Sequence, residues 1–251
     1  MKLEPLLQYL DSYLGTDDFP DYSAAWNGLQ VEGPEEVGHL VAAVDASTAS
    51  IQAAVDRHAD LMVVHHGLFW GGSAPLTGRL LGRVRPLIEN RVALYSSHLP
   101  LDAHAEVGNN ALLARALGLA LEGRFDAYQG TPVGWHGRLN PTDVAGLRAL
   151  AEAAIAGPVR VIEGGPSRIE RVGVVTGSGA DALAEAAALG LDALVTGECH
   201  HHHGIDAMEL GIHLVLAGHY ATETFGVKAL AAHVAERFDL TWEFVDLPTG
   251  L

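Results

Sequence analysis

Two stretches of this sequence place a carboxylate four residues after a histidine, each directly behind an apolar run. His219 and Glu223 follow the apolar run 212–217, and His98 and Asp102 follow a similar run. Open α/β sheets bind ligands just beyond the carboxyl ends of their strands. An imidazole and a carboxylate at such a strand end can hold a cation together, so each pair is a candidate cation-binding element.

A third apolar run, residues 60–64, ends in the adjacent histidines His65 and His66. Adjacent side chains of a regular strand point to opposite faces of the sheet. The two imidazoles therefore need a backbone turn to reach one ion, which Gly67 permits, or they serve two neighbouring ions.

Two neighbouring ions require donors from all three strand ends. The candidate metal ligands are His65, His66, Asp102, His219 and Glu223. Mixed imidazole and carboxylate donors favour Zn, Mn, Fe, Ni or Co over Ca or Mg. Paired ions roughly 3.5–4 Å apart polarise the substrate in many hydrolases. Taken singly, each residue is more typical of a packed core histidine or a turn carboxylate, but their joint occurrence at three strand ends favours a dinuclear metal site.

The composition limits the function classes. The chain has 251 residues, of which 15 are basic and 31 acidic, and a formal net charge of −16. Binding to a nucleic-acid backbone requires a basic surface, so direct nucleic-acid binding is not expected. The single cysteine, Cys199, excludes an intrachain disulfide and indicates a reducing compartment. The sequence shows neither a signal peptide nor an apolar run of membrane-spanning length, so we expect a cytoplasmic protein without membrane association.

Strand-like and helix-like segments alternate through the first half of the chain. Leucines at helical spacing predict a helix over residues 3–14, closed by Gly15. The alternation that follows predicts mostly parallel strands with right-handed crossovers. The expected strands are 39–45, 60–64 and 91–97, and the expected helices are 48–58, 77–90 and 107–118.

The second half repeats this order of elements. Val41–Ser47 resembles Val172–Ser178, and residues 59–66 resemble residues 191–198. Such a repeat predicts a duplicated fold. The expected strands of the second half are 158–162, 192–196, 212–217 and 240–245, and its expected helices are 143–154, 200–210 and 226–238.

We therefore expect an α/β protein of two similar lobes, residues 1–125 and 126–251, with mostly parallel sheets. A stretch containing glycine and proline, 125–139, is expected to connect the lobes as a strand or a hairpin. The alignment of the halves places Glu198 where the first half has His66.

Several residues near the strand ends allow two interpretations. His98 either orients a metal ligand or acts as a general acid or base. Glu198 and the run His200–His203 lie either at the mouth of the site or, for at least two of the histidines, on a solvated helix face. Trp26, in the loop 17–33, either caps the core or lies at the mouth of the site, and its spacing favours the core. No nucleophile elbow and no phosphate-binding glycine motif is present.

Five sequence motifs carry a family resemblance that covers nearly the whole chain. They are Trp26–Gly33, Val64–Trp70, His98–His104 with Gly108–Asn110, Thr196–Glu198 and Ala217–Glu223. Together they resemble the NIF-three-like family of dinuclear-metal proteins, known in bacteria as GTP cyclohydrolase I type II homologues. The resemblance implies two interlinked α/β lobes with a metal site in the cleft between them, assembled as a homohexamer.

The same resemblance implies a ligand set that agrees with the one above. Two divalent ions (Zn, Fe, Mn, Ni or Co) would be bound by the residues that match the family's ligands. These residues are His65, His66, Asp102, His219 and Glu223.

The implied activity is metal-dependent hydrolysis of a small-molecule substrate, a nucleotide in the named reaction, which opens the ring of GTP and releases formate. Glu198 or His98 would carry protons, and Trp70 or Tyr220 would stack on the base. The sequence is also compatible with a metal-dependent phosphoesterase, because paired ions suit phosphoryl oxygens equally well. A third alternative is a non-catalytic metal-binding or interaction protein, because fold does not fix function.

Overall fold

The computed structural model describes residues 1–70, 72 and 74–251, and it divides into two compact units. The first unit comprises residues 1–101 and 226–247, and the second comprises residues 102–225 and 248–251. The chain therefore leaves the first unit within helix α4 (Leu99–Ala103) and returns to it within helix α9 (His219–Phe238). The expected boundary at residues 125 and 126 coincides with none of these crossings.

The first unit contains a five-stranded sheet with strand order β1-β4-β3-β2-β11. Its strands are β1 (Gly28–Val31), β2 (His39–Asp45), β3 (Leu61–His66), β4 (Ala93–Ser96) and β11 (Thr241–Phe244). Only β1 runs antiparallel to its neighbour, and the other pairings are parallel as predicted. Strand β1 lies in the stretch expected to be a loop, where it pairs with the edge of β4.

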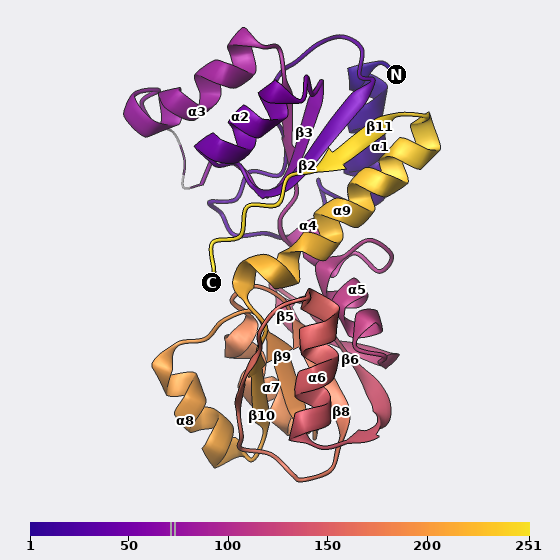
Figure 1. Ribbon diagram of the computed structural model, residues 1–251, viewed down its shortest axis with the longest axis vertical. Coiled ribbons are helices and arrows are strands. Elements are labelled where there is room, and N and C mark those ends of the chain that lie inside the picture. The colour runs from indigo at the N-terminus through magenta and orange to yellow at the C-terminus, as the bar shows by residue number, and fades with distance from the viewer. Residues whose placement is uncertain (71, 73) are drawn as a thin grey trace. The chain divides into compact units, whose positions relative to one another are not determined.

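Helices cover both faces of this sheet: α2 and α3 lie on one face, and α1 and the later turns of α9 on the other (Figure 1). Their bounds are Leu3–Leu14 for α1, Thr48–Asp56 for α2 and Gly78–Glu89 for α3. Helix α1 buries the predicted leucine stripe and ends at Gly15, whose φ of 65° is left-handed. Ser47 caps α2 by accepting a hydrogen bond from the backbone N–H of Ser50 at 3.1 Å.

The second unit contains a six-stranded mixed sheet with strand order β5-β6-β8-β9-β10-β7. Its strands are β5 (Ala120–Tyr128), β6 (Thr131–Thr142), β7 (Arg160–Ile162), β8 (Ile169–Val175), β9 (Ala193–Thr196) and β10 (His213–Leu216). The pairings β8–β9 and β9–β10 are parallel, and the other three are antiparallel. The stretch expected to connect two lobes forms the hairpin β5–β6, which lies inside this unit.

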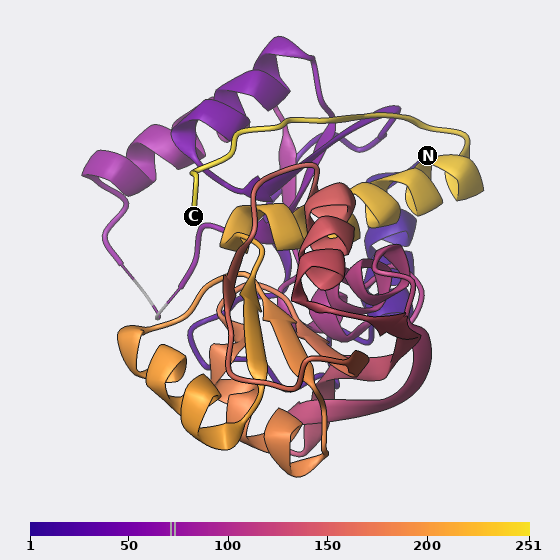
Figure 2. The same cartoon turned by 60° about the horizontal axis from the view of Figure 1, so that its bottom comes forward.

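Helices cover both faces of the second sheet, as Figure 2 shows from below. Helices α5 (Asn109–Ala116) and α6 (Val144–Ile155) pack on one face through Leu113 and Leu147. The other face is covered by the short helix η1 (Gly179–Ala182) through Ala182, by α7 (Leu183–Ala188) through Leu183 and by α8 (His201–Leu210) through Ala207.

Each of the two sheets contains a core of three parallel strands. In the first unit it is β2-β3-β4, and in the second it is β8-β9-β10, each with a helical segment after its first strand. This correspondence agrees with the predicted repeat. It also aligns the carboxyl ends of three strands in each unit, where polar side chains gather.

Helix α9 begins earlier than predicted. The backbone N–H of Thr222 donates to the carbonyl of Gly218 at 3.0 Å, so the first helical turn includes His219 and Glu223 rather than starting at residue 226. The hydroxyl of Thr222 bonds back to the carbonyl of His219 at 2.9 Å. Threonine is a weak helix former, and its hydroxyl competes for backbone groups, so the sequence pattern alone did not reveal this turn.

Candidate metal centre

Strand β3 carries His65 and His66 to the edge of the first sheet. The strand lies between β2 and β4, so its backbone is fixed by hydrogen bonds on both sides. His65 is fully buried, and its Nδ1 donates to the carbonyl of Ser97 at 2.9 Å. In the neutral ring this hydrogen bond places the lone pair on Nε2, which is the arrangement of a metal-binding histidine.

The imidazole of His66 is oriented in the same way, but its partner is a carboxylate. Its Nδ1 lies 2.9 Å from Oδ1 of Asp45, the residue that pairs with it from the end of β2. The ring centroids of His65 and His66 are 4.6 Å apart, so the two imidazoles converge rather than point to opposite faces. Strand β3 ends at His66, and a Cβ atom at the next residue, Gly67, would lie 2.2 Å from Nε2 of Gln30.

His98 is the third imidazole of this cluster. Its ring centroid lies 5.0 Å from that of His65 and 5.7 Å from that of His66. One ring nitrogen from each of the three lies within 4.8 Å of the others. Asp21 holds Nδ1 of His98 at 2.9 Å. Burial tends to raise the pKa of the Asp21 carboxyl, but the hydrogen bond and the charge of His98 outweigh it and keep this pKa below its ordinary value.

The loop before β1 and the strand itself hold the backbone at His98 and at Leu68. Asn27 accepts a hydrogen bond from the backbone N–H of His98 at 2.8 Å. Gln30 donates to the carbonyl of Trp26 at 2.7 Å and accepts from the backbone N–H of Leu68 at 2.6 Å. The side chain of Trp26 itself is 65% exposed, so the prediction that it caps the core was wrong.

In the second unit, the first turn of α9 brings His219 and Glu223 together. Nε2 of His219 lies 3.1 Å from Oε1 of Glu223, and its Nδ1 lies 2.9 Å from Oε1 of Glu198. Glu223 is only 3% exposed. The hydrogen bond to Glu223 raises the pKa of His219 to about 9, against the effect of burial and with a further contribution from Glu198. This imidazole is therefore protonated at neutral pH, and binding of a metal ion through Nε2 would require loss of the Nε2 proton.

Asp102 lies on helix α4, where the sequence predicted a loop. It is 6% exposed, and its Oδ1 accepts hydrogen bonds from Asn109 at 2.8 Å and from the Thr176 hydroxyl at 3.3 Å. Asn110 accepts from the backbone N–H of Thr176 at 2.6 Å. The pair Asn109 and Asn110 thus ties the Asp102 carboxylate to the end of β8.

Gly177 was not predicted as part of the site. Its φ is 63°, and a Cβ atom there would lie 2.2 Å from Oε1 of Glu223 and 3.3 Å from Nε2 of His219. Its backbone N–H donates to Thr222 at 3.0 Å, and its carbonyl accepts from the backbone N–H of Glu198 at 3.0 Å. The sequence contains glycines at this place, but they were considered only as a phosphate-binding motif, which they do not match.

The predicted residues therefore fall into groups that are each built within one unit. His65, His66 and His98 cluster in the first, and His219, Glu223 and Glu198 in the second, where Asp102 has its own polar network. The sequence did not single out Asp21 and Asp45, the carboxylates that orient His98 and His66. Asp45 could have been found, since it ends a predicted strand at the position matching Thr176.

Comparison with known proteins identifies the family of this chain. The family model Duf34/NIF3 (NGG1p interacting factor 3) matches residues 1–249. The chain belongs to the Duf34/NIF3 family. Among its relatives, a protein of Deinococcus radiodurans is 46% identical over 99% of this chain and 94% of its own length, and one of Archaeoglobus fulgidus is 40% identical over the full length of both. Both are named "GTP cyclohydrolase 1 type 2 homolog".

Two solved structures share the fold of this chain. The protein ybgI, described as of unknown function, has a TM-score of 0.93 and 38% identity, and TTHA1606 from Thermus thermophilus has a TM-score of 0.92 and 42% identity. Each comparison covers 100% of both chains. Among the described residues of this NIF3 protein, no helix is long and apolar enough to cross a membrane.

Proposed function

We propose that this NIF3 protein binds two divalent metal ions and is a metal-dependent hydrolase, with ring opening of GTP and release of formate as the candidate reaction. The proposed ligands are His65, His66, Asp102, His219 and Glu223. The reaction is taken from the names of the relatives, which call them cyclohydrolase homologues.

One observation carries the metal proposal: the histidines of the ligand set have their Nδ1 atoms held by oxygen acceptors. Ser97, Asp45 and Glu198 supply these oxygens, each at 2.9 Å. Such a partner fixes the ring orientation and directs Nε2 to an ion. Histidines that only pack in a protein core have no reason to be held through Nδ1 in every case. The donors, imidazole and carboxylate, fit Zn, Mn, Fe, Ni or Co.

When bound, divalent ions supply Lewis acidity that polarises the substrate. The chain's own groups orient the ligands and move protons. His98, held through Nδ1 by Asp21, can hold or release a proton at Nε2. Glu198, the other proposed proton carrier, accepts a hydrogen bond from His219 and keeps its side chain 41% exposed. Tyr220 is buried, so of the two aromatic residues expected to stack on a base, only Trp70, 42% exposed, offers its ring.

The test is incubation of metal-replete protein with GTP, followed by assay of formate. We expect formate above a control containing the metal alone, and its loss in His66→Ala. Absence of formate with Zn, Mn, Fe and Co would remove GTP as the substrate.

The same samples distinguish the alternative functions. Phosphate release from a panel of phosphoesters, abolished by His66→Ala, would identify a phosphoesterase. Retention of two ions without any turnover would identify a non-catalytic metal-binding protein.

A further inference from the structure

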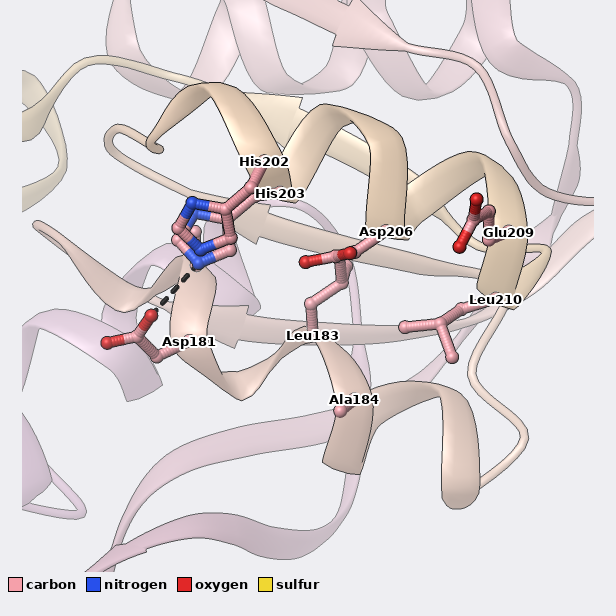
Figure 3. A pocket seen from close by; sticks show the side chains of 9 residues that line it. Asp181, Leu183, Ala184, His202, His203, Asp206, Glu209 and Leu210 are labelled. Carbon is pink, nitrogen blue, oxygen red and sulfur yellow. Dashed lines mark hydrogen bonds and ion pairs between the residues drawn. The ribbon is translucent and has the colours of Figure 1, made fainter.

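A second group of side chains that could hold a metal ion lies at η1 and the start of helix α8, apart from the proposed ligands. Asp181, His202 and His203 each offer a donor atom within 4.8 Å of the others. They line a cavity of about 570 Å³ together with Asp206 and Glu209. Figure 3 shows the two imidazoles and Asp181 at one end of this pocket, with Asp206 directed into it from the next turn of α8.

His203 has a structural role that fixes its protonation. Its Nδ1 accepts a hydrogen bond from the backbone N–H of His200 at 3.0 Å, which caps α8. The neutral ring must therefore carry its proton on Nε2, and this N–H donates to Oδ1 of Asp181 at 2.9 Å. Metal binding through Nε2 would require this neutral ring to lose its only N–H proton, so His203 orients Asp181 instead of serving as a ligand.

His202 remains as a donor of this group, and Asp206, which lines the same cavity but is not one of the three grouped residues, is the candidate for the third donor. They are separated by four residues on α8, a spacing that puts two side chains on one face of a helix. The His202 ring is exposed and packs on the buried ring of His203, with centroids 4.0 Å apart. The hydrogen bond from His203 occupies Oδ1 of Asp181 and orients the carboxylate so that Oδ2 is available to a third partner.

We propose that His202, Asp181 and Asp206 bind one exchangeable divalent transition-metal ion, and that His203 is the residue that positions Asp181.

The charges around the pocket favour a cation over an anion. Three carboxylates line it, from Asp181, Asp206 and Glu209, and no Lys or Arg is among the described residues that do so. The positive end of the α8 dipole opposes a cation at this place. The carboxylates must offset that repulsion, and the donor set is largely exposed, so we expect an ion that exchanges readily. One imidazole with carboxylates suits Zn²⁺, Ni²⁺ or Co²⁺.

The experiment compares two adjacent histidines. His201 is also exposed on α8, but it lines a different cavity beside Cys199 and Ile205. Zn²⁺ and Ni²⁺ binding is measured by equilibrium dialysis with elemental analysis for the wild type, His202→Ala and His201→Ala. We expect His202→Ala to weaken one site by more than about 10-fold, and His201→Ala to leave that site unchanged.

Two outcomes would overturn the proposal. Unchanged binding in His202→Ala would show that no such site exists. Equal losses in His202→Ala and His201→Ala would indicate unspecific binding to the histidine run.

The role of His203 has its own readout. In His203→Gln, binding should weaken by about 10–100-fold, as for removal of a ligand-orienting partner. Titration of the wild type followed by nitrogen NMR of the imidazoles should shift the His202 signals while His203 keeps its proton on Nε2. Direct metal coordination by Nε2 of His203 would contradict its assigned role.

This inference is independent of the function proposed above. Glu223→Gln, which alters the proposed dinuclear site, should leave the ion at α8 in place. His202→Ala should leave the ions at the dinuclear site in place.

Discussion

The Glu223 carboxylate is nearly fully buried beside an imidazole, and its charge is the property that a metal centre would need. Gln has almost the same shape but is neutral, so Glu223→Gln should fold normally and lose the charge that offsets the repulsion between two cations. We expect this variant to retain fewer ions than His98→Ala, which should weaken metal binding or activity only about 10–100-fold if His98 orients rather than binds.

The measurement is metal stoichiometry by elemental analysis after dialysis, with circular dichroism to establish that both variants are folded. Each variant serves as the control for the other. Two ions retained in Glu223→Gln and lost in His98→Ala would place His98, and not Glu223, among the ligands.

The pKa of His219, raised to about 9 by Glu223, predicts how the metal-free protein responds to pH. The value in the unfolded chain is about 6.5. The folded state therefore holds a proton more tightly, and this contribution to stability is complete below pH 6.5 and is lost between about pH 6.5 and 9. Taking about 1.4 kcal/mol per pKa unit, the difference between about 6.5 and about 9 corresponds to about 3.5 kcal/mol, and solvent screening of the partly exposed ring lowers this value.

Denaturant unfolding in EDTA at pH 6 and at pH 9.5 measures this loss. Glu223→Gln should reduce the difference between the two pH values, because Gln stabilises the imidazolium less. A wild-type stability that is independent of pH over this range would show that the His219–Glu223 contact is not formed without metal.

Most helices and strands could be predicted from the regular spacing of their apolar residues. The remaining elements could not, because they depend on hydrogen bonds between side chains and the backbone. Helix α1 and strands β2 and β3 follow directly from apolar spacing. Strand β1 and the first turn of α9 do not, because their sequences are dominated by Asn, Gln and Thr side chains that bond to the backbone. The same limit applies to the site: ligand types show in the sequence, whereas the partners that orient them, such as Asp21, lie 77 positions away from His98.

The turn after β8 allows a prediction about backbone shape. Gly177→Ala places a Cβ atom at 2.2 Å from Oε1 of Glu223 and forces an alanine into φ of 63°. The left-handed conformation alone costs an alanine about 1–2 kcal/mol. The contact should displace Glu223 in addition, so metal retention should fall together with stability.

Gly211→Ala is the matched control for this variant. Gly211 has φ of 72°, but a Cβ atom there meets nothing within 4 Å. Both variants should lower the thermal midpoint, and only Gly177→Ala should lower the number of bound ions. Equal metal content in the two variants would mean that Glu223 adjusts without loss of binding.

The repeated core explains why donors appear in both units. In each unit three parallel strands end side by side, β2-β3-β4 in the first and β8-β9-β10 in the second. Asp45, His66 and His98 follow the first set, and Thr176, Glu198 and His219 follow the second. Open α/β sheets bind ligands at strand ends of this kind. Repetition of the three-stranded core therefore gives each unit one sheet edge with polar side chains.

Association between copies of this chain depends on its exposed apolar side chains and on its net charge. We propose that the chain forms the homohexamer that the family resemblance implies, and the exposed apolar side chains of Trp26, Tyr22, Met208 and Ile205 are candidates for its contact surfaces. Each chain also carries a formal charge of −16, so copies repel one another at low ionic strength, and salt reduces this repulsion.

We therefore expect light scattering at micromolar concentration to give six times the 26.5 kDa of one chain, with dissociation favoured as salt is removed. A mass of one chain at all salt concentrations would exclude the hexamer, and a hexamer that dissociates as salt is added would show that ion pairs, rather than apolar contacts, hold it together.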